Sequence, residues 1–169
     1  MSTELYWVDG PWPGKLALAA RPRGGDWLAD EIAGWHRAGV DTVVSLLTPD
    51  EEHDLDLHAE RSEVASHGLE FVSLPIPDRQ VPPSEGPVMS VLDKLDSTLR
   101  SGKNAVVHCR QGVGRSGLVA ACLLVAKGTD PETAVRNLSA ARGVAIPETA
   151  EQRRWIDRFA ALVANAKVR

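Results

Sequence analysis

The fold is decided by the stretch Val106-Val107-His108-Cys109-Arg110-Gln111-Gly112-Val113-Gly114-Arg115-Ser116-Gly117. Its residue pattern predicts a buried strand, a loop with two glycines and the start of an apolar helix. Amides of such a loop can point inward at a tetrahedral oxyanion, and the helix that follows adds about half a positive charge at its N-terminus. The stretch therefore predicts an anion-binding loop between a strand and a helix.

Two side chains of this stretch can carry chemistry. Arg115 presents a planar guanidinium fork that matches two oxygens of a phosphate group. Cys109 lies in the field of the same helix N-terminus and cation, which favours the thiolate, the nucleophilic form of cysteine. Gly112 and Gly114 let the backbone between them turn tightly. Cys109 could instead be a small buried hydrophobe at a strand end, but that interpretation gives Arg115 and both glycines no role.

Outside this stretch, short β-branched runs alternate with longer segments of helical periodicity. Strands are predicted over residues 42–47, 70–74 and 105–108, and an edge hairpin over residues 5–8 and 16–19. The first helix is predicted between Asp26 as its N-cap and Gly39, and others start at the Thr48–Glu51 capping box, near Ser84, at Arg115, at Asp130 and around Trp155. This order predicts an α/β protein with a central, mostly parallel sheet flanked by helices, as a single domain over residues 1–169.

The composition limits the classes of function. The 169 residues are 43% hydrophobic and 25% charged, which suits one domain with a real core. The 19 Lys and Arg against 23 Asp and Glu give a net charge of −4, which argues against a general nucleic-acid-binding surface. The longest apolar run, residues 118–126, is shorter than the roughly 18 residues that cross a bilayer, and residues 1–10 lack the features of a secretory signal. We therefore expect a cytoplasmic protein with no nucleic-acid or membrane partner.

Outside the stretch around Cys109, we interpret the remaining cysteine and the clustered acidic and histidine residues as structural rather than functional. The chain has two cysteines, Cys109 and Cys122, too few for a disulfide framework, and Cys122 is expected in the core. Residues 50–60 hold six acidic residues without Lys or Arg, and we expect a solvated, exposed stretch there. His53 and His58 do not have the spacing of a metal site.

The pattern around Cys109 resembles that of a known family. His108-Cys109, five further residues and Arg115-Ser116, with glycine at the third and fifth of the five, is similar to the loop of the cysteine-dependent protein tyrosine and dual-specificity phosphatases. The resemblance implies a phosphotyrosine phosphatase-like fold and a phosphoric monoester hydrolase without cofactor or metal. It implies that Cys109 attacks phosphorus, that Ser116 stabilises the departing thiolate and that His108 orients the loop. It also implies that the phosphoryl group is held by Arg110, Gln111, Gly112, Val113, Gly114 and Arg115.

A phosphatase of this type also needs a general acid for the leaving oxygen. Asp78, in Pro75-Ile76-Pro77-Asp78-Arg79, resembles the aspartate of the family's mobile acid loop, although it could also be a plain turn residue. Ile76 stands where tyrosine-specific members have tryptophan, so the chain is more similar to the small dual-specificity members. Gln152 resembles a water-positioning glutamine of some members, but Thr149 and Gln152 also fit a helix capping box. Arg79 and Arg110 either contact the substrate phosphate or are surface charges.

The leading interpretation is a monomeric protein phosphatase that acts on phosphotyrosine, and also on phosphoserine and phosphothreonine, through a cysteinyl-phosphate intermediate. Its partner would be a phosphorylated protein or peptide. Three alternatives stay open: a non-catalytic phosphoprotein-binding module, a sulfurtransferase or oxyanion reductase with a similar loop, and a phosphatase of a phosphoinositide, sugar or RNA phosphate. A binding module has no need of Asp78 as an acid. Phosphoinositide hydrolysis would favour lysines where this loop has Gln111 and Val113.

Overall fold

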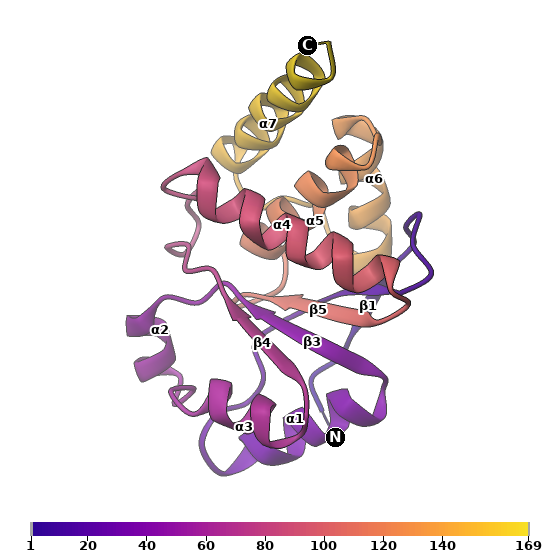
Figure 1. The fold of residues 1–169 in the computed structure, drawn as a ribbon. Helices are drawn as coiled ribbons and strands as arrows, with labels where there is room; N and C mark the ends of the chain where they lie inside the picture. The colour runs from indigo at the N-terminus through magenta and orange to yellow at the C-terminus, as the bar shows by residue number, and fades with distance from the viewer. Residues whose placement is uncertain (1, 169) are drawn as a thin grey trace.

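A computed structural model describes residues 2–168, which form a five-stranded sheet with helices on both faces (Figure 1). The strands are β1 (Tyr6–Val8), β2 (Leu16–Ala19), β3 (Val40–Ser45), β4 (Glu70–Ser73) and β5 (Asn104–His108). The helices are α1 (Leu28–Arg37), α2 (Pro49–Asp54), α3 (Glu60–Ser66), α4 (Glu85–Arg100), α5 (Gly114–Ala126), α6 (Pro131–Arg142) and α7 (Ala150–Val168). The predicted α/β class with a mostly parallel sheet is confirmed.

Strand β5 lies at the centre of the sheet, whose order is β1-β2-β5-β3-β4. It pairs in parallel with β2 and β3, and its last residue, His108, lies in register with Ala19 and Ser45 at their ends. The carboxyl ends of three parallel strands therefore meet where the chain leaves β5, and ligands of α/β proteins bind at such an edge. The predicted hairpin of β1 and β2 forms, but only β1 is at the edge, because β2 pairs with β5 on its other side.

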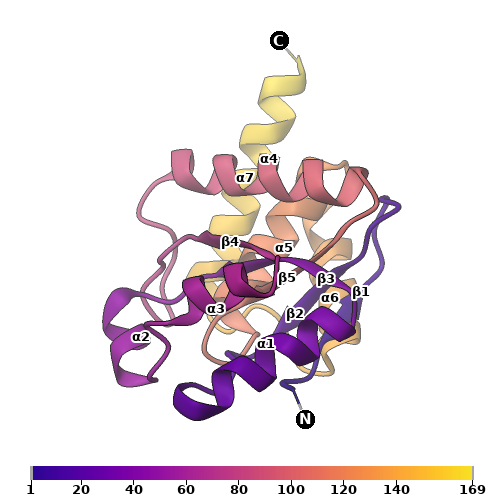
Figure 2. The same ribbon diagram turned by 60° about the horizontal axis from the view of Figure 1, so that its bottom comes forward.

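The alternation of side chains along β5 divides the core between the two faces of the sheet. Ala105 and Val107 belong to the cluster that includes α4, α5 and α7, and Val106 belongs to the cluster under α1 and α3 (Figure 2). Helix α5 is buried along nearly its whole length. It carries Cys122 in the core, as predicted, where burial raises the pKa of the thiol. The N-terminus of α5 is thus fixed by packing on the sheet.

Helix ends show which local signals determine the structure. Thr48 and Glu51 form the predicted capping box of α2, and Asp130 caps α6. Asp26 is not the N-cap of α1, because it lies inside a 3-10 turn at Gly25–Trp27 that precedes the helix. The Gly25 backbone N–H donates to the Asp56 carbonyl oxygen at 2.9 Å, so a tertiary contact holds this turn.

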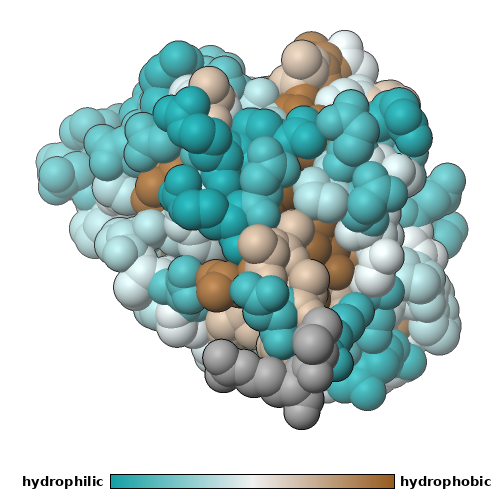
Figure 3. Space-filling model, turned by 90° about the horizontal axis from the view of Figure 1, so that it is seen from above, coloured by the Kyte–Doolittle hydropathy of each residue, from teal (hydrophilic) through white to brown (hydrophobic). Residues whose placement is uncertain are grey.

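The helical layer leaves a band of apolar surface, visible from above among hydrophilic side chains (Figure 3). It includes the exposed Met89 of α4 and Leu162 of α7, which line a shallow groove with Phe159. The C-terminal part of α7 extends beyond the sheet and its covering helices (Figure 2). None of these groove residues lines the cavity at the end of β5 that is described next.

Candidate active site

The loop of residues 109–113, called the nucleophile loop below, joins β5 to the N-terminus of α5. The side chain of Cys109 is 3% exposed, and the Gly112 backbone N–H donates to its Sγ at 3.3 Å. Gly112 has a φ of +73°, and a Cβ there would lie 2.4 Å from the Ala19 carbonyl oxygen of β2. Glycine is therefore required by the backbone conformation and by the close approach to the sheet.

Arg115 lies in the first turn of α5 and is only 1% exposed. Its Nη1 donates to Glu51 Oε1 at 2.6 Å and to the Ile76 carbonyl oxygen at 2.8 Å, and its Nη2 donates to Glu51 Oε2 at 2.9 Å. Burial alone would raise the pKa of Glu51, but hydrogen bonds from Arg115 and the Thr48 backbone, and the charge of Arg115, lower it to about 2. The carboxylate is therefore ionised at neutral pH and fixes the plane of the guanidinium.

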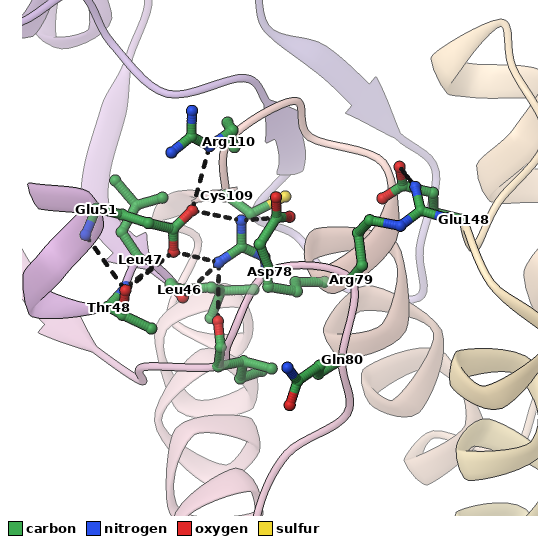
Figure 4. Close-up of polar contacts among 12 residues, drawn as sticks. Leu46, Leu47, Thr48, Glu51, Asp78, Arg79, Gln80, Cys109, Arg110 and Glu148 are labelled. Carbon is green, nitrogen blue, oxygen red and sulfur yellow. Dashed lines mark hydrogen bonds and ion pairs between the residues drawn. The ribbon is translucent and has the colours of Figure 1, made fainter. Parts of the chain in front are cut away.

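Two buried glutamates correct the expectation that residues 50–60 are merely exposed. Glu51 is 7% exposed because it pairs with Arg115, and Glu60 is fully buried because it pairs with His108. The partners are 64 and 48 residues apart in the sequence, so no local pattern could indicate either contact. Glu51 Oε2 also accepts a hydrogen bond from Arg110 Nε at 3.3 Å (Figure 4).

His108 supports the nucleophile loop from the face of the sheet opposite α5. Its Nε2 lies 2.6 Å from Glu60 Oε2, its Nδ1 lies 3.4 Å from the Cys109 carbonyl oxygen, and its ring is tilted against Trp35. These contacts hold the ring between the buried carboxyl group of Glu60 and the first peptide group of the nucleophile loop. This geometry agrees with the loop-orienting role that the family resemblance implies.

The segment of residues 75–83, called the acid loop below, has no regular structure, as its prolines predict. Asp78 Oδ1 accepts from Arg115 Nη2 at 3.0 Å, and the Asp78 side chain is 48% exposed. Arg79 has a φ of +63°, and its Nη1 lies 2.5 Å from Glu148 Oε1, in the segment before α7. Asp78 and Arg79 therefore point in opposite directions, one to Arg115 and one to Glu148 (Figure 4).

A narrow cavity of about 30 Å³ lies between the two loops, and it brings most of the predicted site together. Its lining consists of Asp78, Cys109, Arg110, Gln111, Gly114, Arg115 and Glu148. Six of these seven residues were predicted from the sequence, and Glu148 was missed because the nearby Gln152 carries the recognisable motif. Gly112, Val113, Ser116 and Gln152, which were also predicted, do not line the cavity.

Gln152 and Ser116 are fully buried. Gln152 Oε1 accepts from the backbone N–H groups of Glu148 and Thr149, and Thr149 Oγ1 accepts from the Gln152 N–H, so the capping box is present. Gln152 Nε2 also donates to the Gln80 carbonyl oxygen at 3.1 Å, which ties the acid loop to α7. Ser116 Oγ has no hydrogen-bond partner within residues 2–168.

Other sequence features lie away from the cavity. Residues 2–168 contain no group of three or more His, Cys, Asp or Glu side chains arranged to hold a metal ion. Within the same residues, none of the helices combines the length and the apolar composition needed to cross a membrane. The exposed His58 is near Asp56 and does not line the cavity. The chemistry-bearing groups are thus concentrated at the end of β5.

Comparison with protein families gives the family of the chain. Residues 4–159 match the model described as "Swiss Army Knife protein, DSP-PTPase phosphatase domain". The chain belongs to this phosphatase family. The predicted resemblance is confirmed, and so is the predicted enzyme class, because the family is one of phosphoric monoester hydrolases of the protein phosphatase type.

Curated proteins similar to this DSP-PTPase domain include cyclin-dependent kinase inhibitor 3 of two mammals. The protein of Rattus norvegicus is 32% identical over 107 residues, which cover 62% of this chain and 47% of that protein. The protein of Homo sapiens is 34% identical over 71 residues, covering 41% of this chain and 34% of that protein. The chain spans about half the length of the curated relatives it matches.

Solved structures give the same fold. The structure of kinase associated phosphatase with its catalytic-site cysteine replaced by serine has a TM-score of 0.89 at 21% identity, covering 97% of each chain. Tk-PTP in its active form has a TM-score of 0.76 at 26% identity, covering 93% of this chain and 96% of that one. The phosphatase-type fold predicted from the sequence is therefore confirmed.

Proposed function

We propose that this domain hydrolyses phosphomonoesters on phosphorylated proteins, with Cys109 as nucleophile and Asp78 as general acid. Its main support is that the buried thiol of Cys109, the guanidinium of Arg115 and the carboxyl group of Asp78 all line one cavity. A module that only bound phosphate would use Arg115 and the loop amides, but it would need neither the thiol nor the carboxyl group. Membership in a phosphatase family supports turnover over binding.

Two chemical steps follow from this arrangement. In the first, the Cys109 thiolate attacks phosphorus, an S–P bond forms, the P–O bond to the leaving group breaks, and Asp78 gives its proton to the leaving oxygen. In the second, water attacks phosphorus, Asp78 takes the proton of that water, and the S–P bond breaks to release phosphate. Arg115 and the loop amides stabilise the phosphoryl oxygens in both steps. The Ser116 hydroxyl, which has no hydrogen-bond partner among the described residues, is available to donate to the departing thiolate.

The hydrogen bonds of Arg115 indicate how substrate enters. Nη1 is committed to Glu51 and Ile76, and Nη2 to Glu51 and Asp78. Nε has no acceptor within residues 2–168. The edge of the guanidinium that can bind substrate therefore consists of the Nε N–H group and the Nη2 N–H group that donates to Asp78. Phosphoryl oxygens that bind this edge displace Asp78, which then moves toward the leaving oxygen that it protonates.

The cavity lining also supports breadth of substrate. None of the seven residues that line the cavity is aromatic, and Ile76, at the position of the family tryptophan, is fully buried. Without an aromatic wall there is no ring stack that would require phosphotyrosine. We infer that phosphotyrosine is hydrolysed fastest, because an aryl oxide leaves most readily, and that phosphothreonine and phosphoserine are hydrolysed more slowly.

The names of the relatives and the state of the cysteines support proposals for the substrate protein and the cellular compartment. The name of the mammalian relatives refers to cyclin-dependent kinases, so phosphorylated protein kinases are candidate substrates for this chain. Two free, buried cysteines agree with a reducing, cytoplasmic compartment. We propose that residues 1–169 act there as one catalytic domain and as a monomer.

A turnover assay with matched cysteine variants tests the proposal. Wild type should hydrolyse an aryl phosphate with a chelator present throughout, and Cys109→Ser should be inactive yet still bind vanadate. Cys122→Ser is the matched control, since it changes the other buried cysteine, and it should keep wild-type activity. Peptides that differ only in the phosphorylated residue measure breadth. Activity of Cys109→Ser near that of wild type would overturn the assignment of Cys109 as nucleophile. Turnover of the phosphotyrosine peptide alone would overturn the proposed activity on phosphothreonine and phosphoserine.

A further inference from the structure

Four successive carbonyl oxygens of the nucleophile loop, those of residues 109–112, are contacted by polar groups of residues that do not line the cavity. His108 Nδ1 and the Arg21 backbone N–H contact the first two, at 3.4 and 3.3 Å. Arg142, at the C-terminus of α6, contacts the last two, from Nη2 at 3.0 Å and from Nε at 3.2 Å. A single guanidinium thus holds two neighbouring peptide groups.

Peptide geometry converts these contacts into an orientation of the amides. In a trans peptide the C=O and N–H bonds of one unit point in opposite directions. Holding the carbonyl groups of residues 109–112 outward therefore aims the N–H groups of residues 110–113 inward. The Gly112 N–H shows this orientation directly, since it donates to Cys109 Sγ at 3.3 Å. These inward N–H groups are the donors that an oxyanion over Cys109 would meet.

Arg142 is itself held in place by the edge strand of the sheet. Its guanidinium carbon lies 4.0 Å from the centre of the Tyr6 ring of β1. The guanidinium therefore lies between an aromatic face and two carbonyl oxygens, and a planar group with donors along one edge fits both contacts. Arg142 does not line the cavity, so any effect it has on a bound phosphate passes through the loop.

We propose that Arg142, stacked on Tyr6, is a positioning residue that pre-organises the phosphate-binding amides of the nucleophile loop. The proposal rests on the proposed phosphatase function and assigns a role in it to a residue outside the cavity. Loss of Arg142 would leave the amides of residues 112 and 113 free to turn away. Binding of a phosphoryl group would then have to reorder the loop, which lowers affinity and rate.

The test compares Arg142→Met with Arg136→Met, an exposed arginine of the same helix. For each variant, the measurements are the inhibition constant of vanadate, kcat and KM for an aryl phosphate, and the midpoint of thermal unfolding. Arg142→Met should weaken vanadate inhibition and lower kcat/KM by about 10- to 100-fold, somewhat below the loss expected for a direct oxyanion donor. Arg136→Met should match wild type. Arg142→Lys should recover only part of the loss, because an ammonium group cannot hold two carbonyl groups in one plane.

Tyrosine variants separate positioning from stability. Tyr6→Phe keeps the ring under Arg142 and should leave vanadate inhibition unchanged, whereas Tyr6→Ala should weaken it severalfold. If Arg142→Met does not fold, Arg142→Lys and Tyr6→Ala provide the same comparison. Wild-type vanadate affinity in folded Arg142→Met, or in both substitutes, would overturn the proposal even if thermal stability fell. A wild-type protein without turnover would instead overturn the proposed function.

Discussion

The nucleophile loop and the acid loop meet at one cavity, but they differ in how they are held. Cys109 and Arg115 are 3% and 1% exposed, and Arg115 is fixed by two contacts with the buried Glu51. In the acid loop, the Asp78 and Arg79 side chains are 48% and 62% exposed. Arg79 pairs with the partly exposed Glu148, and the half-exposed Asp78 pairs with the buried Arg115. Exposed ion pairs contribute little to stability, whereas breaking a buried one is costly.

This difference assigns separate tasks to the two loops. A buried loop with fixed donors suits a phosphoryl group that must be held in the same way through two chemical steps. The exposed turn at Asp78 and Arg79 can leave Arg115 when substrate arrives and can deliver Asp78 to the leaving oxygen. The loop stays anchored on either side of this turn by the buried Ile76 and by the hydrogen bond from Gln152 to Gln80. Substitutions of Asp78 or Arg79 should therefore alter the rate of hydrolysis with little change in the free energy of unfolding. Substitutions of Arg115 or Glu51 should alter both.

Among the changes that test this comparison, Asp78→Asn should produce the largest change in rate. We expect kcat with an aryl phosphate to fall by about 10²- to 10⁴-fold, the scale for loss of a general acid, and the basic limb of the pH profile to flatten. The free energy of unfolding should stay within about 0.5 kcal/mol of wild type, as for a surface substitution. The exposed Asp93→Asn on α4 serves as control. An unchanged pH profile would assign the acid to another residue.

Arg115→Lys should lower both rate and stability. A lysine ammonium cannot make the two-point contact with Glu51 and cannot support two phosphoryl oxygens in one plane. We expect kcat/KM to fall by about 10²-fold, the scale for loss of an oxyanion donor. Steady-state kinetics and thermal unfolding of the same preparation measure both effects. A loss of less than about tenfold, or about 1.4 kcal/mol, would contradict the role of the fork.

Glu51→Gln tests the buried side of the comparison through pH. The pKa of Glu51 is lowered from 4.5 to about 2 in the folded protein, so its contribution to stability is complete above pH 4.5 and is lost as the pH falls toward 2. The full contribution is at most about 3 kcal/mol. Denaturant unfolding at several pH values should show this loss in wild type and in the exposed Asp50→Asn control, but not in Glu51→Gln. Parallel curves for all three proteins would show that the ion pair does not stabilise the fold.

Arg79→Gln should have the smallest effect. It removes the exposed ion pair with Glu148, which is worth about 0.2 to 1 kcal/mol, so kcat/KM should change by a few-fold at most. Because salt screens exposed charges, the difference from wild type should disappear in about 1 M salt. Kinetics at low and high ionic strength measure this. A larger loss that persists in salt would mean that the acid loop is fixed rather than mobile.

The sequence predicted the parts of the site that lie within one continuous stretch. Cys109, the glycines and Arg115 occupy a single strand, loop and helix, so their spacing alone indicates their arrangement. Asp78 required the family resemblance, because nothing local relates it to Arg115. Glu51, Glu60, Glu148 and Arg142 were missed, because each depends on a contact between elements far apart in the chain.

The same distinction explains the fold. Capping residues such as Thr48 and Asp130 act on their own helix and were predicted correctly. Asp26 was assigned wrongly, because the turn that contains it is held by Asp56, thirty residues further along the chain. The inner position of β2 also depends on pairing with β5, which the local pattern of the hairpin does not encode.

The central claim is that the nucleophile loop presents Cys109 to a phosphoryl group held by Arg115. The most direct measurement is mass spectrometry of the protein quenched in acid during turnover of an aryl phosphate. We expect one phosphoryl group on the peptide that contains Cys109, and none in Cys109→Ser. Turnover without this adduct in wild type, or an adduct on another residue, would contradict the account.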